Sequence, residues 1–570
     1  MMVYDHWHCS PVDENAVQTL QNSLPLELAV CRILVQMGIS DPASAQVFLR
    51  PDLGQLHDPF LMADMHKAVD RLRRAVQHHE RILLYGDYDA DGVCGVAMCF
   101  DFLKSVHSHV DFYIPRRDTE GYGISSEGIE YARSKQCTLI IAIDCGIRDA
   151  EHIAAAQAMG IDVVVCDHHL PAAMLPPAFA VLDPLRSDCA YPFKGLSGCG
   201  VAFKLLQGFA EKQGISDALL HHQLDLLALS TACDLMPMTG ENRILTIRGL
   251  HAINRTRRVG LRALLQQSHC NAPLGVRDLV FKLGPLLNAA GRMGDAADTV
   301  RLLLATDRHA AQLQAGKLAL LNKARRDADY GAFEQAYLTW DARQEAGAQR
   351  GIVLSDPLWQ PGVLGIVAAR MAERYGKPAV MLGLRNGEWV GSARGAQGIS
   401  VEKALMHADS TLSTWGGHAQ AAGLRLEYRQ LDAFAAAFEQ GVRLQQPDGP
   451  QSRILHVSSK LSFDALTAKL AQQIESLGPF GPGHRSPVFV AEDVRDTGQG
   501  RRMGQQHIQV HLQQGNVKME GIGFGLAEAY EKVRYGAFDI AFGLRNEHWH
   551  GHSVVRLQIK DVRPRQSKGL

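Results

Sequence analysis

Three aspartates alternate along one short segment of the sequence, Asp87-Tyr-Asp89-Ala-Asp91-Gly92. Three carboxylates this close repel one another unless a cation lies among them, and hard divalent ions bound by oxygen ligands are the usual solution in proteins. A solvated acidic turn is the alternative interpretation. The spacing therefore favours a site for divalent metal ions at this point of the chain.

Further acidic and imidazole side chains follow two later apolar runs. Asp144 comes directly after residues 139–143, and Asp167-His-His169 comes directly after residues 163–166. Because the carboxyl ends of parallel strands meet at one edge of a sheet, these side chains are expected in a single crevice. In that setting, metal binding is favoured over a structural or exposed histidine pair.

Asp234 ends another apolar run, residues 224–229, where it is either a helix cap or a further ligand. Carboxylates and imidazole, with no required thiolate, suit Mn²⁺ or Mg²⁺ better than structural zinc. Two such ions could activate a water molecule and stabilise charge on phosphoryl oxygens while a phosphodiester is cleaved. These residues thus point to metal-dependent hydrolysis.

The elements that would position these side chains form an alternation of apolar runs and helical segments. The candidate strands lie at 81–85, 110–114, 139–143 and 162–165. The helical segments between them include 93–106 and 148–159. This alternation predicts an α/β domain with a doubly wound parallel sheet.

The pattern changes further along the chain. Few helix breakers occur from 296 to about 345, which predicts a long connecting helix or a bent pair of helices. A second α/β pattern runs from 351 to about 439, and a turn-rich segment follows at 445–452. Alternating apolar and polar residues beyond it predict a small antiparallel β domain.

Composition sets the broad class. A chain of 570 residues exceeds the roughly 250–300 residues at which single cores stop growing, so several domains are expected. No run approaches about 18 apolar residues and the first residues lack a secretory signal, which predicts a cytoplasmic protein without a membrane segment. Eleven cysteines without a C-x-x-C pair predict reduced thiols.

The overall charge indicates no particular partner. Lys and Arg total 59 and Asp and Glu total 60, which leaves a formal net charge of −1. A nucleic-acid-binding protein usually carries a basic surface. If this chain binds nucleic acid, its basic surface must therefore be local and balanced by acidic residues elsewhere.

Nine motifs carry a resemblance to a known family. They are Phe48-Leu-Arg-Pro, Leu56-His-Asp-Pro-Phe60, Tyr85-Gly-Asp-Tyr-Asp-Ala-Asp-Gly92, Ile143-Asp-Cys-Gly146, Asp167-His-His-Leu-Pro171, Asn288-Ala-Ala-Gly-Arg292, Gly362-Val-Leu-Gly365, Gly416-Gly-His-Ala-Gln-Ala-Ala-Gly423 and Pro479-Phe-Gly-Pro-Gly483. In this order they resemble the DHH phosphoesterase superfamily and, within it, the bacterial single-strand-specific exonucleases. The resemblance covers nearly the whole chain.

The resemblance implies a series of modules, with single-stranded DNA threaded between the catalytic and DHH-associated domains. The expected modules are an N-terminal helical segment of the catalytic core (1–75), a DHH catalytic domain (76–300), a connecting helix (301–345), a second α/β, DHH-associated domain (346–445) and a C-terminal β-barrel of the OB fold (455–565).

The resemblance also implies roles for individual residues. The metal ligands would be Asp89, Asp91, Asp144, His168 and Asp234, with Asp87 and His169 assisting beside them. DNA and its 5′-terminal phosphate would be bound by Arg116, Arg117, Arg292, Ser392, Arg394, Gly416, Gly417 and His418. Arginine suits this task because its planar fork donates two hydrogen bonds to phosphate. An exposed arginine turn and a packed glycine turn are the alternatives.

Two residues depart from the family pattern. Leu286 stands where the family usually has arginine, and Gln360 stands where it usually has histidine. Because the expected metal ligands are all present, hydrolysis should survive while substrate affinity or strand positioning differs. Tyr122, Trp359 and Trp415 either stack on bases or pack in a core.

The function implied is that of a 5′→3′ exonuclease on single-stranded DNA. It would use two Mn²⁺ or Mg²⁺ ions, release 5′-mononucleotides, and act in DNA repair and recombination beside a single-strand-binding protein and a helicase. One alternative is a DHH-type phosphodiesterase or phosphatase for short oligonucleotides or dinucleotides, which the extra β domain disfavours. The other is a catalytically inactive single-strand-binding scaffold, which the retained ligands disfavour.

Overall fold

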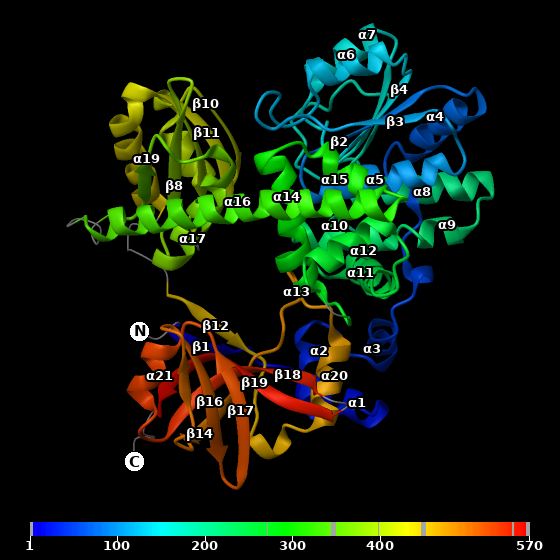
Figure 1. Ribbon diagram of the computed structural model, residues 1–570. Coiled ribbons are helices and arrows are strands. Elements are labelled where there is room, and N and C mark those ends of the chain that lie inside the picture. The colour runs from blue at the N-terminus through cyan, green and yellow to red at the C-terminus, as the bar shows by residue number, and fades with distance from the viewer. Residues whose placement is uncertain are drawn as a thin grey trace. The chain divides into compact units, whose positions relative to one another are not determined.

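The computed structural model describes residues 4–270, 272–343, 349–396, 398–445, 452–549 and 552–565. The chain divides into two compact units (Figure 1). The larger unit comprises Pro59–Asp234 and His251–Gln451, and the smaller comprises Met1–Asp58, Leu235–Leu250 and Ser452–Leu570. In the described part of the chain, no helix combines the length and apolarity that a membrane span requires.

A five-stranded parallel sheet organises the first part of the larger unit, in the order β3-β2-β4-β5-β6. Its strands are β2 (Ile82–Gly86), β3 (Val110–Tyr113), β4 (Leu139–Ile143), β5 (Asp162–Cys166) and β6 (Ala180–Leu182). All residues of β2 and β4 are buried, as expected for strands covered on both faces. The predicted doubly wound parallel sheet is confirmed.

Helices cover both faces of this sheet. On one face, α6 (Ser126–Ser134) and α7 (Ala150–Ala158) share a hydrophobic core with β2, β4 and β5. On the other face lie α5 (Ala90–Lys104) and α8 (Gly198–Gln213), and α4 (Met65–Gln77) packs beside α8. The carboxyl ends of the strands therefore belong to a sheet that helices cover on both faces.

A helical region follows the sheet along the chain. Its helices are α9 (Asp217–His221), α10 (Leu224–Cys233), α11 (Gly240–Ile253), α12 (Val259–Gln267), α13 (Val276–Asp278), the π-helical turn Leu279–Leu283, α14 (Gly284–Met293) and α15 (Ala297–Leu303). Residues 235–250, which include most of α11, belong to the smaller unit.

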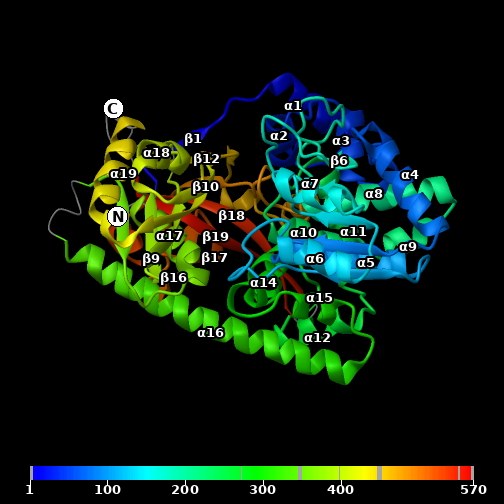
Figure 2. The same cartoon turned by 90° about the horizontal axis from the view of Figure 1, so that it is seen from above.

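Of the two alternatives predicted from 296 to about 345, a long helix or a bent pair, the structure shows two helices. A short helix, α15, ends at Leu303, and the 34-residue α16 (Arg308–Asp341) follows it. The Asp307 carboxylate accepts a hydrogen bond from the Ala310 N–H and thereby caps the start of α16. The predicted end at 345 lies outside the described residues. Figure 2 shows α16 passing α12 and α15 at one end and α17 (Pro361–Tyr375) at the other.

A second five-stranded sheet, which helices flank, completes the larger unit, in the order β10-β11-β9-β8-β7. Its strands are β7 (Ile352–Ser355), β8 (Ala379–Arg385), β9 (Glu388–Arg394), β10 (Thr414–His418) and β11 (Ala421–Glu427). Only β7 and β8 pair in parallel. Helices α18 (Val401–His407) and α19 (Leu431–Gln445) pack on one face, and α16 and α17 pack on the other.

The smaller unit contains the C-terminal β-barrel. Its strands are β13 (Ser459–Lys460), β14 (Phe489–Asp496), β15 (Arg501–Met503), β16 (His507–Gln514), β17 (Val517–Gly523), β18 (Phe538–Trp549) and β19 (His552–Pro564), with α20 (Ala468–Leu477) and α21 (Ala527–Val533) between them. Because β14 pairs with both β16 and β18, five strands close on themselves. The predicted barrel is confirmed.

The alternating sequence pattern predicts an antiparallel β domain, but the barrel also contains parallel strand pairs. Strands β17 and β19 pair in parallel, as do β13 and β14. Alternation of apolar and polar residues reports which face of a strand is buried, but it carries no information on the direction of the partner strand. The turn-rich boundary predicted at 445–452 lies, for residues 446–451, outside the described residues.

The N-terminal helices differ from the prediction that residues 1–75 belong to the catalytic core. Helices α1 (Glu14–Ser23), α2 (Leu28–Gln36) and α3 (Pro42–Leu49) share one hydrophobic core with the barrel. Strand β1 (His6–Cys9) likewise pairs with β12 (Ile454–Val457). Helical periodicity marks a buried face without naming the element that covers it, so the sequence could not show this partner.

Candidate metal centre and nucleic-acid cavity

The sheet edge gathers all seven acidic and imidazole residues predicted for the metal site. Ligand atoms lie within 4.8 Å of one another in three overlapping groups: Asp87, Asp89 and Asp144; Asp91, His168 and Asp234; and Asp144, His168 and His169. In the sequence, the three aspartates of the first motif follow β2, Asp144 follows β4, the two histidines follow β5, and Asp234 follows α10. Elements far apart in sequence thus supply one cluster, which we call the acidic cluster.

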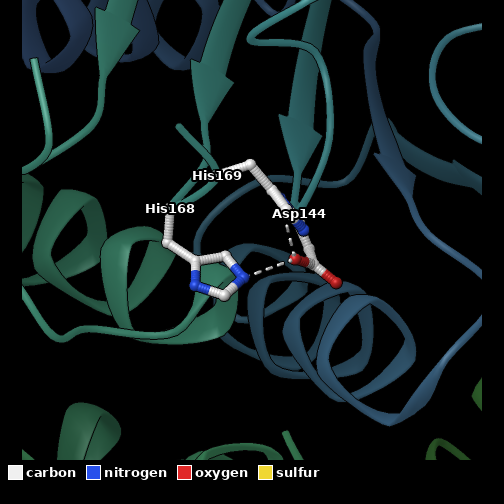
Figure 3. A group of neighbouring side chains, drawn as sticks. All are labelled: Asp144, His168 and His169. Carbon is white, nitrogen blue, oxygen red and sulfur yellow. Dashed lines mark hydrogen bonds and ion pairs between the residues drawn. The ribbon is translucent and has the colours of Figure 1, made fainter. Parts of the chain in front are cut away.

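His168 lies at the centre of the acidic cluster. Figure 3 shows its ring directed at Asp144, and the Nε2 atom is 3.1 Å from Asp144 Oδ1. The same nitrogen is 3.7 Å from Asp91 Oδ2 and 3.7 Å from Asp234 Oδ2. One imidazole therefore faces carboxylates from three different elements.

The carboxylates are held by backbone groups. Asp89 caps α5 by accepting a hydrogen bond from the Asp91 N–H at 2.9 Å. Asp91 accepts the N–H groups of Gly198 and Cys199, at the start of α8, at 2.7 and 3.0 Å. A Cβ atom at Gly198 would lie 2.6 Å from the Asp144 Cα, so only glycine allows α8 to begin this close to the cluster.

The electrostatics of the cluster fit bound cations. Burial, followed by the charge of Asp89, raises the pKa of Asp87 well above its usual range. Burial and the charge of Asp91 do the same for the pKa values of Asp144 and Asp234. Asp87 Oδ1 is also buried and has no hydrogen-bond partner among the described residues. Oxygen and imidazole donors with this uncompensated charge suit Mn²⁺ or Mg²⁺.

Asp167 was expected in the crevice from its position after an apolar run, but neither as a metal ligand nor as a partner of His169. Its carboxylate accepts the backbone N–H groups of Ile147 at 3.1 Å and His168 at 2.7 Å, and it lies 2.7 Å from His169 Nδ1. Burial raises the pKa of Asp167, but the hydrogen bond with His169, the charges of His169 and His168 and the Ile147 N–H together lower it by more, so the net shift is downward. Asp167 therefore orients the His169 ring. Its place at the start of the Asp-His-His motif was the available signal.

Mn²⁺ is expected to raise the temperature at which the protein unfolds. Ions that bind only the folded state stabilise it by about 2.7 kcal/mol at a hundredfold excess over Kd, and here they also relieve repulsion among buried carboxylates. Differential scanning fluorimetry in EDTA and in Mn²⁺ measures the shift. An equal shift in the Asp234→Ala variant would show that the ion acts elsewhere.

A cavity of about 1290 Å³ lies in the larger unit and contains most of the residues predicted to bind DNA. The predicted residues that line it are Arg116, Arg117, Arg292, Ser392, Arg394, Gly416 and Gly417. His418 is not among the lining residues, although it follows Gly417 on β10. The structure thus brings seven of the eight residues together, and we call this space the arginine cavity.

Six arginines line this cavity, and five of them have no carboxylate within ion-pair distance in the described part of the chain: Arg117, Arg292, Arg385, Arg394 and Arg425. The sixth, Arg116, pairs with Asp118 at 3.2 Å. Arg394 donates hydrogen bonds to Ser392 Oγ at 2.8 Å and to the Ala393 carbonyl at 2.9 Å. Burial, followed by Arg117, lowers the pKa of Arg292 to about 10. Positive charge without a partner favours an anion such as phosphate.

The arginine cavity adjoins the acidic cluster. The Arg117 guanidinium lies over the Tyr88 ring, 5.1 Å from its centroid, and Tyr88 separates Asp87 from Asp89 in the sequence. Arg292 in turn donates a hydrogen bond to the Gly362 carbonyl at 3.0 Å, which joins α14 to α17. An anion in the cavity therefore lies next to the strand end that carries the carboxylates.

The structure distinguishes the aromatic candidates. Trp359 belongs to a hydrophobic core and donates its indole N–H to Gln335, so it is a packing residue. Trp415 lines the arginine cavity, and its indole N–H is donated to Asp409 at 2.7 Å. Tyr122 is 49% exposed, donates its hydroxyl to the Asp144 carbonyl and packs its ring edge-on against the His169 ring, so it lies beside the acidic cluster rather than in a hydrophobic core.

The two departures from the family pattern have different settings. Leu286 is buried in α14 and does not line the arginine cavity. Gln360 lines the cavity at the start of α17.

The two glycines of β10 differ in what surrounds them. Packing requires glycine at position 417, where φ is 156°, since a Cβ atom there would lie 2.3 Å from the Ala421 carbonyl oxygen. Gly416 faces open space.

Family models match three parts of the chain. They are the DHH family, N-terminal domain, at residues 81–231, the DHHA1 domain at 348–443, and the RecJ OB domain at 457–561. These matches coincide with the parallel sheet, the second α/β sheet and the barrel. The order is the one predicted from the motifs.

Curated relatives and solved structures agree with these matches. The single-stranded-DNA-specific exonuclease RecJ of Dickeya dadantii is 33% identical over 96% of this chain and 97% of its own length. That of Escherichia coli is 32% identical over 97% and 98%. The crystal structure of RecJ in complex with Mn²⁺ from Thermus thermophilus superposes with a TM-score of 0.84 at 27% identity, covering 99% of this chain and 80% of that one.

The Bacillus subtilis relative, also a single-stranded-DNA-specific exonuclease RecJ, is 31% identical over 98% of this chain and 70% of its own length. Near-complete coverage at this identity, three family models in order, and a fold that carries an acidic cluster beside an arginine cavity lead to one assignment. The chain belongs to the RecJ family of single-stranded-DNA-specific exonucleases.

Proposed function

We propose that this chain is a Mn²⁺- or Mg²⁺-dependent exonuclease that degrades single-stranded DNA in the 5′→3′ direction and releases 5′-mononucleotides. The observation that carries the proposal is the adjacency of the acidic cluster to a cavity with unpaired arginines. The cluster supplies the chemistry of phosphodiester hydrolysis, and the cavity supplies the recognition of a phosphate at the strand end.

Five residues would hold the two ions: Asp89, Asp91, Asp144, His168 and Asp234. When bound, divalent ions supply an activated water molecule and stabilise charge on phosphoryl oxygens. The backbone groups that fix Asp89 and Asp91 set the ligand positions before substrate arrives.

Two residues beside the ligands would assist the reaction. Asp167 holds Nδ1 of His169, so Nε2 is the ring nitrogen left for substrate. Asp87, whose Oδ1 has no hydrogen-bond partner among the described residues, adds a carboxylate to the same group as Asp89 and Asp144.

The terminal phosphate would bind in the arginine cavity. Ser392 and Arg394 provide adjacent donors on β9, and Arg117 and Arg292 add positive charge to the lining. Arg116, which pairs with Asp118, would turn to the phosphate by exchanging that partner. Gly416, Gly417 and His418 would offer backbone and imidazole groups nearby on β10. Because the cavity adjoins the cluster, a bound strand end places the first phosphodiester within reach of the cluster, which favours an exonuclease.

The remaining parts of the proposal concern the cellular setting. A closed five-stranded barrel is a common platform for single strands, which supports a polymeric substrate over a dinucleotide. We place the protein in the cytoplasm, in DNA repair and recombination. We expect a single-strand-binding protein and a helicase as its partners.

The proposal is tested with 5′-labelled single-stranded DNA, duplex DNA and a dinucleotide, each in Mn²⁺. We expect labelled mononucleotides from the single strand only, and a 3′-labelled strand should shorten before its label is released. Binding of the single strand without cleavage would identify a scaffold instead. Cleavage restricted to dinucleotides or fragments of a few nucleotides would identify a short-substrate phosphodiesterase.

A further inference from the structure

The segment that presents Arg116, Arg117 and Tyr122 is an irregular loop between β3 and α6, residues 115–124, which we call the arginine loop. Regular secondary structure does not fix its shape. An irregular loop that must present charged side chains accurately needs specific contacts to hold it, because fixing each residue costs backbone conformational entropy.

One carboxylate, that of Glu120, accepts three hydrogen bonds around this loop. Glu120 Oε1 accepts the Arg116 backbone N–H at 2.8 Å. Glu120 Oε2 accepts the Tyr113 hydroxyl at 2.9 Å and the Ser125 hydroxyl at 2.6 Å. Tyr113 ends β3 and Ser125 caps α6, so a single side chain ties the loop to the elements on both sides of it.

The second half of the loop has further contacts of its own, although Tyr85, which takes part in them, also contacts Ser125. The Ile124 N–H is donated to Asp149 Oδ2 at 2.7 Å, and the Tyr85 hydroxyl is donated to the Gly123 carbonyl at 3.0 Å. Gly123 has φ of 93°, and a Cβ atom there would lie 2.6 Å from the Asp149 carboxylate. This half carries Tyr122, whereas the Glu120 bonds act on the half that carries the arginines.

The Glu120 carboxylate is occupied by its three hydrogen-bond donors, Tyr113, Ser125 and the Arg116 N–H. Glu120 makes no ion pair with Arg116 or Arg117 in the described part of the chain, and it does not line the arginine cavity. Two other carboxylates, Asp118 and Glu388, line the cavity, and Asp118 pairs with Arg116. Glu120 is not among the lining residues, so it orders the loop backbone and leaves the Arg117 guanidinium, over Tyr88, for an anion.

We propose that Glu120 is a positioning residue that sets the preference of the enzyme for strands with a 5′-terminal phosphate. It acts through the arginine loop and touches neither substrate nor metal. The inference rests on the proposed binding of the terminal phosphate in the arginine cavity. It adds that this recognition depends on a carboxylate outside the cavity.

The test compares 5′-phosphorylated and 5′-hydroxyl single strands as substrates of the full-length protein in Mn²⁺. For Glu120→Ala, we expect KM for the phosphorylated strand to rise about tenfold, with kcat and the constants for the hydroxyl strand changed less than about twofold. The preference for phosphate should therefore nearly disappear. Glu130→Ala is the matched control, because Glu130 is an exposed glutamate of α6 paired with Arg133.

Two further variants separate positioning from general damage. Tyr113→Phe removes one donor to Glu120 and keeps the ring, so it should weaken the preference in the same sense but less. Glu120→Gln keeps one acceptor oxygen, so it should retain part of the preference for the phosphorylated strand. Without DNA, trypsin should cut after Arg116 or Arg117 faster in Glu120→Ala than in the wild type, because the loop is released.

The outcomes are distinguishable. Equal loss on both substrates, or an unchanged preference and tryptic rate in Glu120→Ala, overturns the positioning role while the proposed function stands. A wild-type enzyme that treats both strand ends alike overturns the phosphate site and this inference together. Loss of preference with faster loop cleavage and retained kcat supports the inference.

Discussion

Asp89→Ala is expected to lower turnover on single-stranded DNA by about three orders of magnitude or more, because a metal ligand contributes several kcal/mol to the stabilisation of the transition state. The fold should remain. Loss of the cap on α5 costs about 1 kcal/mol, and removal of one buried charge from a repelling cluster offsets it. Steady-state kinetics in Mn²⁺ and circular dichroism measure the two effects.

Asp70→Ala is the control for this variant. Asp70 is an exposed aspartate of α4 that pairs, within the described part of the chain, with the neighbouring Arg73 at 3.4 Å, so its loss should change neither kinetics nor stability. His168→Ala should match Asp89→Ala, since His168 faces three carboxylates of the cluster. Retained activity in either cluster variant would refute the assignment of the metal ligands.

Arg394→Ala is expected to raise KM for 5′-phosphorylated strands by about 10- to 100-fold, which corresponds to the roughly 1.5–3 kcal/mol of a hydrogen bond to a charged group. Ser392 already orients the guanidinium, so little entropy is lost when phosphate binds. Arg394→Lys should recover only part of the loss, because an ammonium cannot replace the planar fork. Kinetics on 5′-phosphorylated and 5′-hydroxyl strands measure the effect.

The control for Arg394→Ala is Arg374→Ala. Arg374 is an exposed arginine in the same α/β half of the larger unit, where it lies over the Tyr337 ring at 4.4 Å and outside the arginine cavity. Its removal tests whether any loss of positive charge weakens binding. A similar rise in KM for both variants would mean that the cavity has no specific role.

The acidic cluster could be predicted from the sequence because its chemistry is tied to strand ends. Carboxylates and histidines directly after apolar runs must share a sheet edge once the runs form a parallel sheet. Six of the seven predicted residues follow a strand of the parallel sheet and meet there. The seventh, Asp234, follows helix α10, and the family resemblance rather than strand-end chemistry indicated it. The role of Asp167 in orienting His169 could not be predicted, because it depends on a side-chain hydrogen bond that spacing along the chain does not show.

The arginine cavity was less accessible to the sequence. The motifs indicated its arginines and glycines, but they did not show that Trp359 packs in a core, that Leu286 is buried, or that His418 lies outside the lining. Whether a polar or aromatic residue faces a cavity depends on the packing of several elements at once. That information exists only in the tertiary structure.

The sequence alone determined the order of the modules, the parallel sheet and the residues of the acidic cluster, because local periodicity and strand-end chemistry act over short stretches of chain. The tertiary structure decided the partner of each buried face. Helices α1–α3 share the core of a barrel formed by the other end of the chain, and β17 pairs in parallel with β19. Periodicity shows which face of a helix or strand must be buried. Which element covers that face, and in which direction a partner strand runs, depends on long-range packing.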